Sequence, residues 1–312
     1  MATRMLGLFM IFPIFSVYAN NYTSVTPLLI GAAIGAYGLT QAFFQIPFGY
    51  LSDKYGRKPL LILGLIIFFI GSIVAATADD IFQVVIGRAL QGAGAISAVL
   101  MAFLADYISE NERPKANAFV GVQIGAAFML ALLLGPIIVY QIGISGLFWT
   151  IAALSVVALL VVTTLPHAKP EKQYTLSIKN FKRVLTPALL RLDFSVFALH
   201  LILTSAFIAI PIFLFENNIL SIQDNWQIYL PVIILSFLGM IPMIIVATKY
   251  QKTKTVFLLA IFLLALSQML FYQTTLNYAT FFIILTLFFT AFNALEALLP
   301  SLIAKTATSD KR

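Results

Sequence analysis

The sequence contains no cysteine and only 2 histidines among its 312 residues. Without cysteine, a disulfide framework, a thiol nucleophile and a thiolate metal site are all excluded from this sequence. It also shows no H-E-x-x-H pattern and no cluster of acidic residues, so no convincing catalytic set is present. We therefore expect a protein that is not an enzyme and that needs no cofactor.

Charge is also scarce. Charged residues make up 10% of the chain and hydrophobic residues 61%, with a mean hydropathy of +0.99, whereas soluble domains are about 25% charged and about 45–50% apolar. The net charge of +7 would suggest nucleic acid only if the bases gathered on one water-exposed face. They lie instead in short loops between apolar runs, so we expect the lipid bilayer as partner and no nucleic acid.

The apolar runs predict an all-α polytopic membrane protein, because a helix needs roughly 20 apolar residues to cross the hydrocarbon core. About ten candidate spans follow one another. They are Met5–Tyr18, Leu28–Tyr50, Leu60–Ala78, Ile81–Leu104, Ala116–Tyr140, Gly146–Leu165, Leu189–Phe215, Ile228–Thr248, Val256–Tyr272 and Ala279–Ile303.

Loop charges predict the orientation, since Lys and Arg are enriched in short cytoplasmic loops. If the amino terminus is cytoplasmic, every base outside the spans falls on the cytoplasmic side. These bases are Arg4, Lys54, Arg57, Lys58, Arg113, Lys115, the run from Lys169 to Arg191, Lys249, Lys252, Lys254, Lys305, Lys311 and Arg312. The opposite loops hold four acids and no base. Both termini are therefore expected in the cytoplasm.

One long polar connection separates six spans from four. We expect an amino-terminal six-helix half at 1–165, a cytoplasmic linker at 166–188 and a carboxy-terminal half of four helices at 189–312. Within the linker, Ile178, Phe181 and Leu185 would share one face of a helix lying on the inner leaflet. A solvated tether explains the same composition equally well.

The loop after the second span carries the most specific motif, Gly49-Tyr-Leu-Ser-Asp-Lys-Tyr-Gly-Arg-Lys-Pro59. Here a carboxylate is placed among three bases in a glycine-hinged turn, and Pro59 suits the first turn of the next helix. A plain positive-inside loop accounts for the bases but not for Asp53 or the two glycines.

This motif resembles the loop signature of the major facilitator superfamily, G-x-L-[SA]-D-[KR]-x-G-R-[KR]-P. The resemblance implies that the arginine pairs with an acid at the end of helix four, here Asp106, and that the aspartate faces a later helix. The implied conformational latch comprises Gly49, Leu51, Asp53, Gly56, Arg57, Lys58 and Asp106.

Inside the fourth span, Arg88 begins a second motif. An arginine in hydrocarbon is costly and marks a functional site by default. The run resembles the R-x-x-Q-G-x-G motif of the same superfamily, which implies a role in proton coupling for Arg88, Gln91, Gly92 and Gly94. A structural arginine satisfied by carbonyls of a neighbouring helix is the alternative.

In the fifth span, Gly125, Gly135 and Pro136 resemble the antiporter motif ending in G-P-x-x-G-G. Val139 and Tyr140 stand where the final glycines would be. Antiport is therefore less well supported than membership of the superfamily.

Glu296 is a carboxylate well inside the last span, and burial would bring its pKa towards neutrality, as proton uptake and release require. Its place towards the inner end also fits a structural acid. Histidine is the side chain type that changes charge near physiological pH, which makes His200 a candidate, although a lone histidine more often serves packing.

Over the whole chain the sequence resembles the YajR-type group of proton-driven drug exporters. That group has twelve spans and a carboxy-terminal domain, so we expect this chain to lack the last two helices and that domain. The resemblance implies a monomeric secondary transporter of a bacterial-type inner membrane, which uses the proton gradient to export lipophilic or amphipathic solutes. A metabolite carrier of the same superfamily and a truncated, non-transporting membrane protein are the alternatives.

Overall fold

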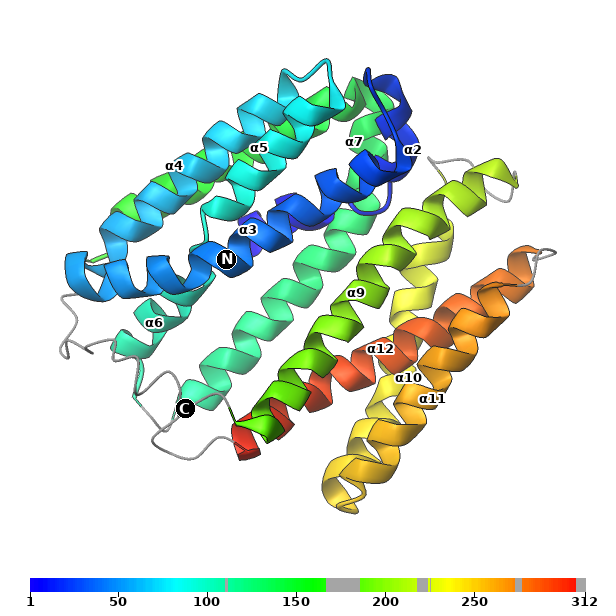
Figure 1. Cartoon of the computed structure of the whole chain (residues 1–312). Helices are drawn as coiled ribbons and strands as arrows, with labels where there is room; N and C mark the ends of the chain where they lie inside the picture. Colours follow the sequence, from blue (N-terminus) through cyan, green and yellow to red (C-terminus); the bar gives the residue numbers. More distant parts are fainter. Residues whose placement is uncertain (110–111, 167–185, 218–223, 225, 273–276, 307–312) are drawn as a thin grey trace. The chain divides into compact units, whose positions relative to one another are not determined.

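The computed structural model describes residues 1–109, 112–166, 186–217, 224, 226–272 and 277–306. Within these ranges the chain is almost entirely helical (Figure 1). The helices are α1 (Ala2–Phe9), α2 (Phe15–Tyr18), η1 (Ala19–Asn21), α3 (Pro27–Tyr55), α4 (Arg57–Ala76), α5 (Ile81–Ala93), α6 (Ser97–Tyr107), α7 (Arg113–Thr164), α9 (Pro187–Glu216), α10 (Trp226–Lys249), α11 (Thr253–Phe271) and α12 (Tyr278–Thr306).

In the described part of the chain, eight helical stretches are long and apolar enough to cross a membrane. They are α3, α4, α5 together with α6, most of α7, α9, α10, α11 and most of α12. Many of their large apolar side chains are exposed, as expected where lipid replaces water. The predicted all-α membrane architecture is confirmed.

The difference between eight stretches and about ten predicted spans has two local causes. First, α7 covers two predicted spans, because Gly143 interrupts it with φ +73 and ψ 176, a conformation that glycine adopts readily. The chain reverses there: Arg113 at the start of α7 contacts Ala105, while Lys58 contacts both Thr163 and Leu165 at its end. Figure 1 shows the second part of α7 passing behind α4.

Second, the first predicted span is not one long helix. It consists of α1 and the four-residue α2, joined by turns at residues 10–14. Met10, Ile11, Ile14 and Phe15 are all buried, so the segment packs inside the helical bundle although neither helix could cross a membrane alone. Pro13 falls in this break and lacks the amide that a continuous helix needs.

Internal contacts divide the chain into two compact units. The first comprises Met1–Thr175 with Phe207–Phe215, and the second Leu176–Ala206 with Glu216–Arg312. The first unit has a core of apolar side chains from α3, α4, α6 and the end of α7, including Phe48, Leu61 and Val99. In the second unit, α12 packs against α10 and α11. The linker predicted at 166–188 lies almost wholly outside the described residues, and the division into halves at 1–165 and 189–312 stays a prediction.

Candidate functional site

The motif loop folds as a tight turn between α3 and α4. Gly56 is the single residue between the two helices and has φ +98, a region that other residues rarely adopt. The turn brings Asp53, in the last helical turn of α3, beside Arg57, the first residue of α4.

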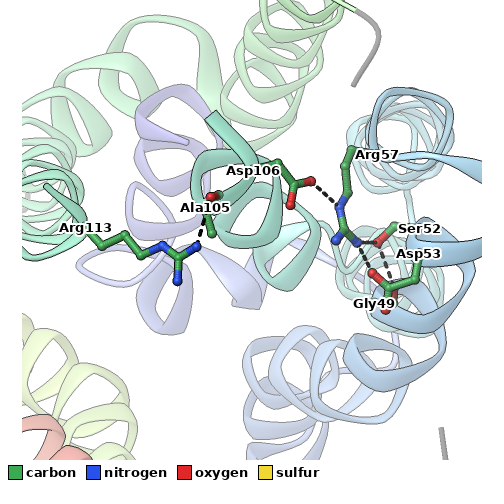
Figure 2. A network of polar contacts seen from close by, with 7 residues as sticks. All are labelled: Gly49, Ser52, Asp53, Arg57, Ala105, Asp106 and Arg113. Carbon is green, nitrogen blue, oxygen red and sulfur yellow. Dashed lines mark hydrogen bonds and ion pairs between the residues drawn. The ribbon is translucent and has the colours of Figure 1, made fainter. Parts of the chain in front are cut away.

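Arg57 is the centre of a polar network, the Arg57 network, formed with Ser52, Asp53 and Asp106 (Figure 2). Its Nη1 donates to Asp53 Oδ1 and, at 2.7 Å, to Ser52 Oγ, while its Nε donates to Asp106 Oδ2 at 3.0 Å. The arginine side chain is 7% exposed and the two carboxylates 25% and 28%. Such partly buried, hydrogen-bonded ion pairs are stronger than surface pairs. The sequence-predicted residues Asp53, Arg57 and Asp106 are therefore together.

Lys58 lies next to this network but has other partners. Its Nζ donates to the carbonyl oxygens of Thr163, at 2.6 Å, and Leu165, at 2.7 Å. These carbonyls belong to the end of α7, where the helix dipole favours a cation. Lys58 thus fixes the end of α7 to the start of α4.

The other loop residues support the turn. The Gly49 carbonyl accepts a hydrogen bond from Ser52 Oγ at 2.7 Å, so the Ser52 hydroxyl links the backbone of α3 to Arg57. Leu51 packs against the apolar core of the first unit. Figure 2 also shows Arg113 Nη2 donating to the Ala105 carbonyl at 3.4 Å, beside Asp106.

A second polar network, the Arg88 network, lies inside the membrane-spanning helices. Arg88 is 1% exposed. Its Nε donates to the Ala33 carbonyl of α3 at 3.2 Å and its Nη1 to Gln91 Oε1 at 2.7 Å. Gln91 Nε2 donates in turn to Ser72 Oγ of α4 at 2.9 Å. The network therefore connects α3, α4 and α5. It contains the Arg88–Gln91 pair of the motif. It also contains a backbone carbonyl from a neighbouring helix, the kind of partner that a purely structural arginine would have.

The glycines of the same motif have a packing role. A Cβ at Gly92 would overlap the Tyr37 carbonyl oxygen of α3, and one at Gly94 would overlap the Gly64 carbonyl oxygen of α4. Only glycine allows α5 to approach both neighbours this closely. Close helix packing is thus a sufficient reason for both glycines.

Arg4 corrects one sequence-based expectation. It was counted among the bases of the cytoplasmic loops, but its side chain is buried, with 3% of the residue exposed. Its guanidinium carbon lies 5.7 Å from the ring centres of both Tyr37 and Phe68, and its Nη1 donates to Ser97 Oγ at 3.0 Å. The sequence locates Arg4 only by its place before an apolar run, so the packing of α1 is what shows its burial.

The antiporter-motif residues separate into two environments. A Cβ at Gly135 would lie 2.6 Å from the Met10 carbonyl oxygen, so this glycine lets α7 approach the broken first segment. Pro136 follows within the helix. At Gly125 a Cβ would meet no described atom within 4 Å. The structure therefore gives Gly135, but not Gly125, a packing role.

In the second unit, Glu296 lies on α12 with its Oε2 3.8 Å from His200 Nε2 of α9. The carboxylate is 47% exposed and the imidazole 50%. The described helices thus leave about half of the Glu296 side chain uncovered by protein, and its burial within the bilayer stays a prediction. The periodicity of a long apolar helix indicates that an acid lies within a span but not which side of the helix is covered.

These features define a polytopic helical membrane protein with polar networks inside one bundle, and comparison with known proteins agrees. The family model of the Major Facilitator Superfamily matches residues 1–312. The inner membrane transport protein YajR of Escherichia coli K12 is 41% identical over 307 residues, covering 97% of this chain and 67% of that protein. An uncharacterized transporter, BU466, of Buchnera aphidicola from Acyrthosiphon pisum is 37% identical over 315 residues, covering 99% of this chain and 80% of that protein.

A shorter match is the class B tetracycline resistance protein of Escherichia coli, 30% identical over 163 residues, or 50% of this chain and 40% of that protein. Among solved structures, a bacterial homologue of the human lysosomal transporter Spinster, inward-facing and unoccupied, superposes with a TM-score of 0.78 at 14% identity, covering 99% of this chain and 74% of that one. This likeness concerns the fold. The chain belongs to the major facilitator superfamily.

Proposed function

We propose that this protein is a monomeric secondary transporter that exports lipophilic or amphipathic solutes in exchange for protons across a bacterial inner membrane. The observation that carries the proposal is Arg88, a charged residue 1% exposed within a membrane-spanning helix. Burial of a charge costs several kcal/mol, and intramembrane ionisable residues therefore mark substrate or ion pathways. Supporting this, its partner Gln91 is the second polar residue of the motif associated with proton coupling.

The Arg57 network is the part of the site whose contacts change between the two conformations in this proposal. In this proposal the two halves, 1–165 and 189–312, alternate between states open to opposite sides. The ion pairs of Arg57 with Asp53 and Asp106 form in one state and break in the other, while Gly49, Leu51, Gly56 and Lys58 hold the turn. The bases around this network support a cytoplasmic position for it and for both termini.

For the coupling proton, Glu296 is the proposed carrier. It is the acid that lies within α12, and His200 faces it at 3.8 Å. A half-exposed carboxylate exchanges protons with an aqueous path more readily than a fully enclosed one. In this proposal the helices around the path are shaped by Gly92, Gly94, Gly135 and Pro136, and Gly125 leaves open space on α7.

The experiment is proton-driven efflux in proteoliposomes. The protein is reconstituted with a lipophilic dye, a pH gradient is imposed, and dye movement is followed by fluorescence. We expect gradient-dependent transport that Arg88→Ala abolishes without loss of insertion. Lys254→Ala, an exposed base at the start of α11, is the matched control and should transport normally.

Two results would contradict the proposal. Dye movement indifferent to the gradient in the unsubstituted protein would refute proton coupling, and full export by Arg88→Ala would make Arg88 structural. The other candidate function is a metabolite carrier of the same superfamily, since the loop signature specifies no solute. Gradient-driven uptake of a polar metabolite in place of dye would select it.

A further inference from the structure

A second arginine, Arg4, is buried beside the Arg88 network, and no acid pairs with it among the residues that the structure describes. Arg4 and Arg88 contact the same aromatic ring: their guanidinium carbons lie 5.7 and 4.9 Å from the ring centre of Tyr37. All three residues are at most 3% exposed. The two positive charges therefore share one enclosed part of the first unit.

No carboxylate of the surrounding helices compensates these charges. The sequence has no Asp or Glu from Met1 to Ser52, from Lys54 to Ala78 or from Ile81 to Ala105. Among the described residues, Nε and Nη2 of Arg4, Nη2 of Arg88 and the Tyr37 hydroxyl are buried and have no hydrogen-bond partner. Buried polar groups are normally satisfied, and an unpaired buried guanidinium is especially costly. Four donor groups are thus available at this place.

A helix start lies at the same place. The fourth span is interrupted at residues 94–96, between α5 and α6, so α6 begins inside the membrane-spanning stretch at Ser97. Its N-cap residue, Ile96, provides no side-chain cap. Arg4 Nη1 donates to Ser97 Oγ at 3.0 Å, and Gln41 Nε2 donates to the same oxygen at 3.4 Å. The positive end of α6 and its free amides therefore adjoin the Arg4 guanidinium.

From these observations we propose that Arg4 and the start of α6 bind an anionic oxygen group, a carboxylate or phosphate, with Arg88 and Tyr37 completing the site. Discontinuous helices in transporters direct half-helix amino ends at anionic substrate groups in this way. The solute is then an amphipathic acid, because the apolar ring of Phe68 and the spans around it contact the rest of the molecule. This inference rests on the proposed transport function and specifies its solute class.

The site is closed in this structure, and α1 provides the entrance. Arg4 lies on α1, which has only eight residues and ends in turns at residues 10–14. A short helix with an irregular end moves at less cost than the long helix α7 against which it packs. Displacement of α1 would expose the donors of Arg4 and the start of α6 together.

The test is a binding titration that needs no gradient. The protein in phosphatidylcholine nanodiscs is titrated with 11-(dansylamino)undecanoate and with its methyl ester, which differ only in the anionic group. We expect the acid to bind about tenfold to a hundredfold more tightly than the ester. Arg4→Gln should reduce the affinity for the acid to that for the ester, Arg4→Lys should retain part of the preference, and Lys254→Gln should leave it unchanged.

Equal affinity of the unsubstituted protein for acid and ester would overturn the proposal even if Arg4→Gln failed to fold, and so would an unchanged preference in a folded Arg4→Gln protein. Adding phosphatidylglycerol to the nanodiscs distinguishes the source of the anion: competition with the probe assigns it to a lipid headgroup, and no competition to a free solute. Both results support anion binding. Preferential acid binding without gradient-driven export would refute the proposed transport while leaving the anion site.

Discussion

The ammonium group of Lys58 lies 2.6 Å from the carbonyl oxygen of Thr163, which is 105 residues further along the chain. This contact joins the start of α4 to the end of α7 at the end of the bundle that carries the Arg57 network. The motif loop therefore has two separate attachments, Arg57 to α6 through Asp106 and Lys58 to α7. The signature describes one stretch of sequence, but its bases act on two different helices.

Lys58→Met should destabilise the first unit, because the carbonyls of Thr163 and Leu165 lose a charged donor. We expect a loss of about 1.5–3 kcal/mol in the free energy of unfolding, the value for a hydrogen bond to a charged group. Thermal unfolding in detergent measures it. Lys54→Met, an exposed neighbour in the same loop, is the control. Equal melting temperatures of the two variants would show that the Lys58 contacts contribute nothing.

Arg57 and Asp106 should be energetically coupled. In a double-mutant cycle of Arg57→Gln and Asp106→Asn, we expect a coupling free energy of about 1–2 kcal/mol, below the value for a fully buried pair because Asp106 is 28% exposed. Unfolding midpoints of the four proteins give the coupling. Additive effects of the two substitutions would refute a direct ion pair.

Gly94→Ala should be far more damaging than Gly125→Ala. A methyl group at Gly94 would overlap the backbone of Gly64, whereas one at Gly125 would meet no described atom within 4 Å. Overpacking costs about 1–3 kcal/mol, while alanine in an open helical position is neutral or slightly stabilising. The two variants are compared by the amount of folded protein after membrane extraction and by its melting temperature. Equal behaviour would contradict the close approach of α5 to α4.

The orientation can be tested with single cysteines, since the sequence contains none of its own. Lys54→Cys, beside the Arg57 network, should react with an impermeant maleimide only from the cytoplasmic side. Asp79→Cys, in the loop before α5, should react only from the opposite side; both positions are exposed. Labelling is measured in intact cells and in inverted vesicles, which expose opposite sides of the membrane to the reagent. A reversed pattern would invert the proposed topology.

Gln91→Ala should weaken transport less than Arg88→Ala. The Gln91→Ala substitution removes one hydrogen-bond partner of the Arg88 guanidinium, but its hydrogen bond to the Ala33 carbonyl and its contact with the Tyr37 ring remain. We expect roughly a tenfold loss of gradient-driven export, corresponding to one hydrogen bond of about 1.4 kcal/mol. Ser72→Ala, one bond further from Arg88, should lose less. A larger loss for Ser72→Ala than for Gln91→Ala would contradict this order of contacts.

The sequence by itself determined the class of protein. Runs of apolar residues about 20 long have few alternatives to membrane-spanning helices, because a backbone in hydrocarbon must satisfy its own hydrogen bonds. The resemblance of the motif loop to the superfamily signature likewise predicted that Arg57 meets Asp106, and the structure adds the one-residue turn at Gly56 that brings Asp53 beside Arg57. The apolar runs and the motif can be read directly from the order of residues.

Tertiary structure decided what lies inside the bundle. Arg4 and Lys58 look alike in sequence, because each is a base just before an apolar run. In the structure, however, Arg4 is enclosed by residues of α3, α4 and α6, whereas Lys58 binds the end of α7. The sequence places Glu296 within an apolar run, and the packed helices leave about half of its side chain uncovered by protein. Which side of an apolar helix is covered depends on neighbours distant in the chain, and in a membrane every side is apolar. Hydrophobic periodicity therefore does not distinguish the sides, and only the packed structure does.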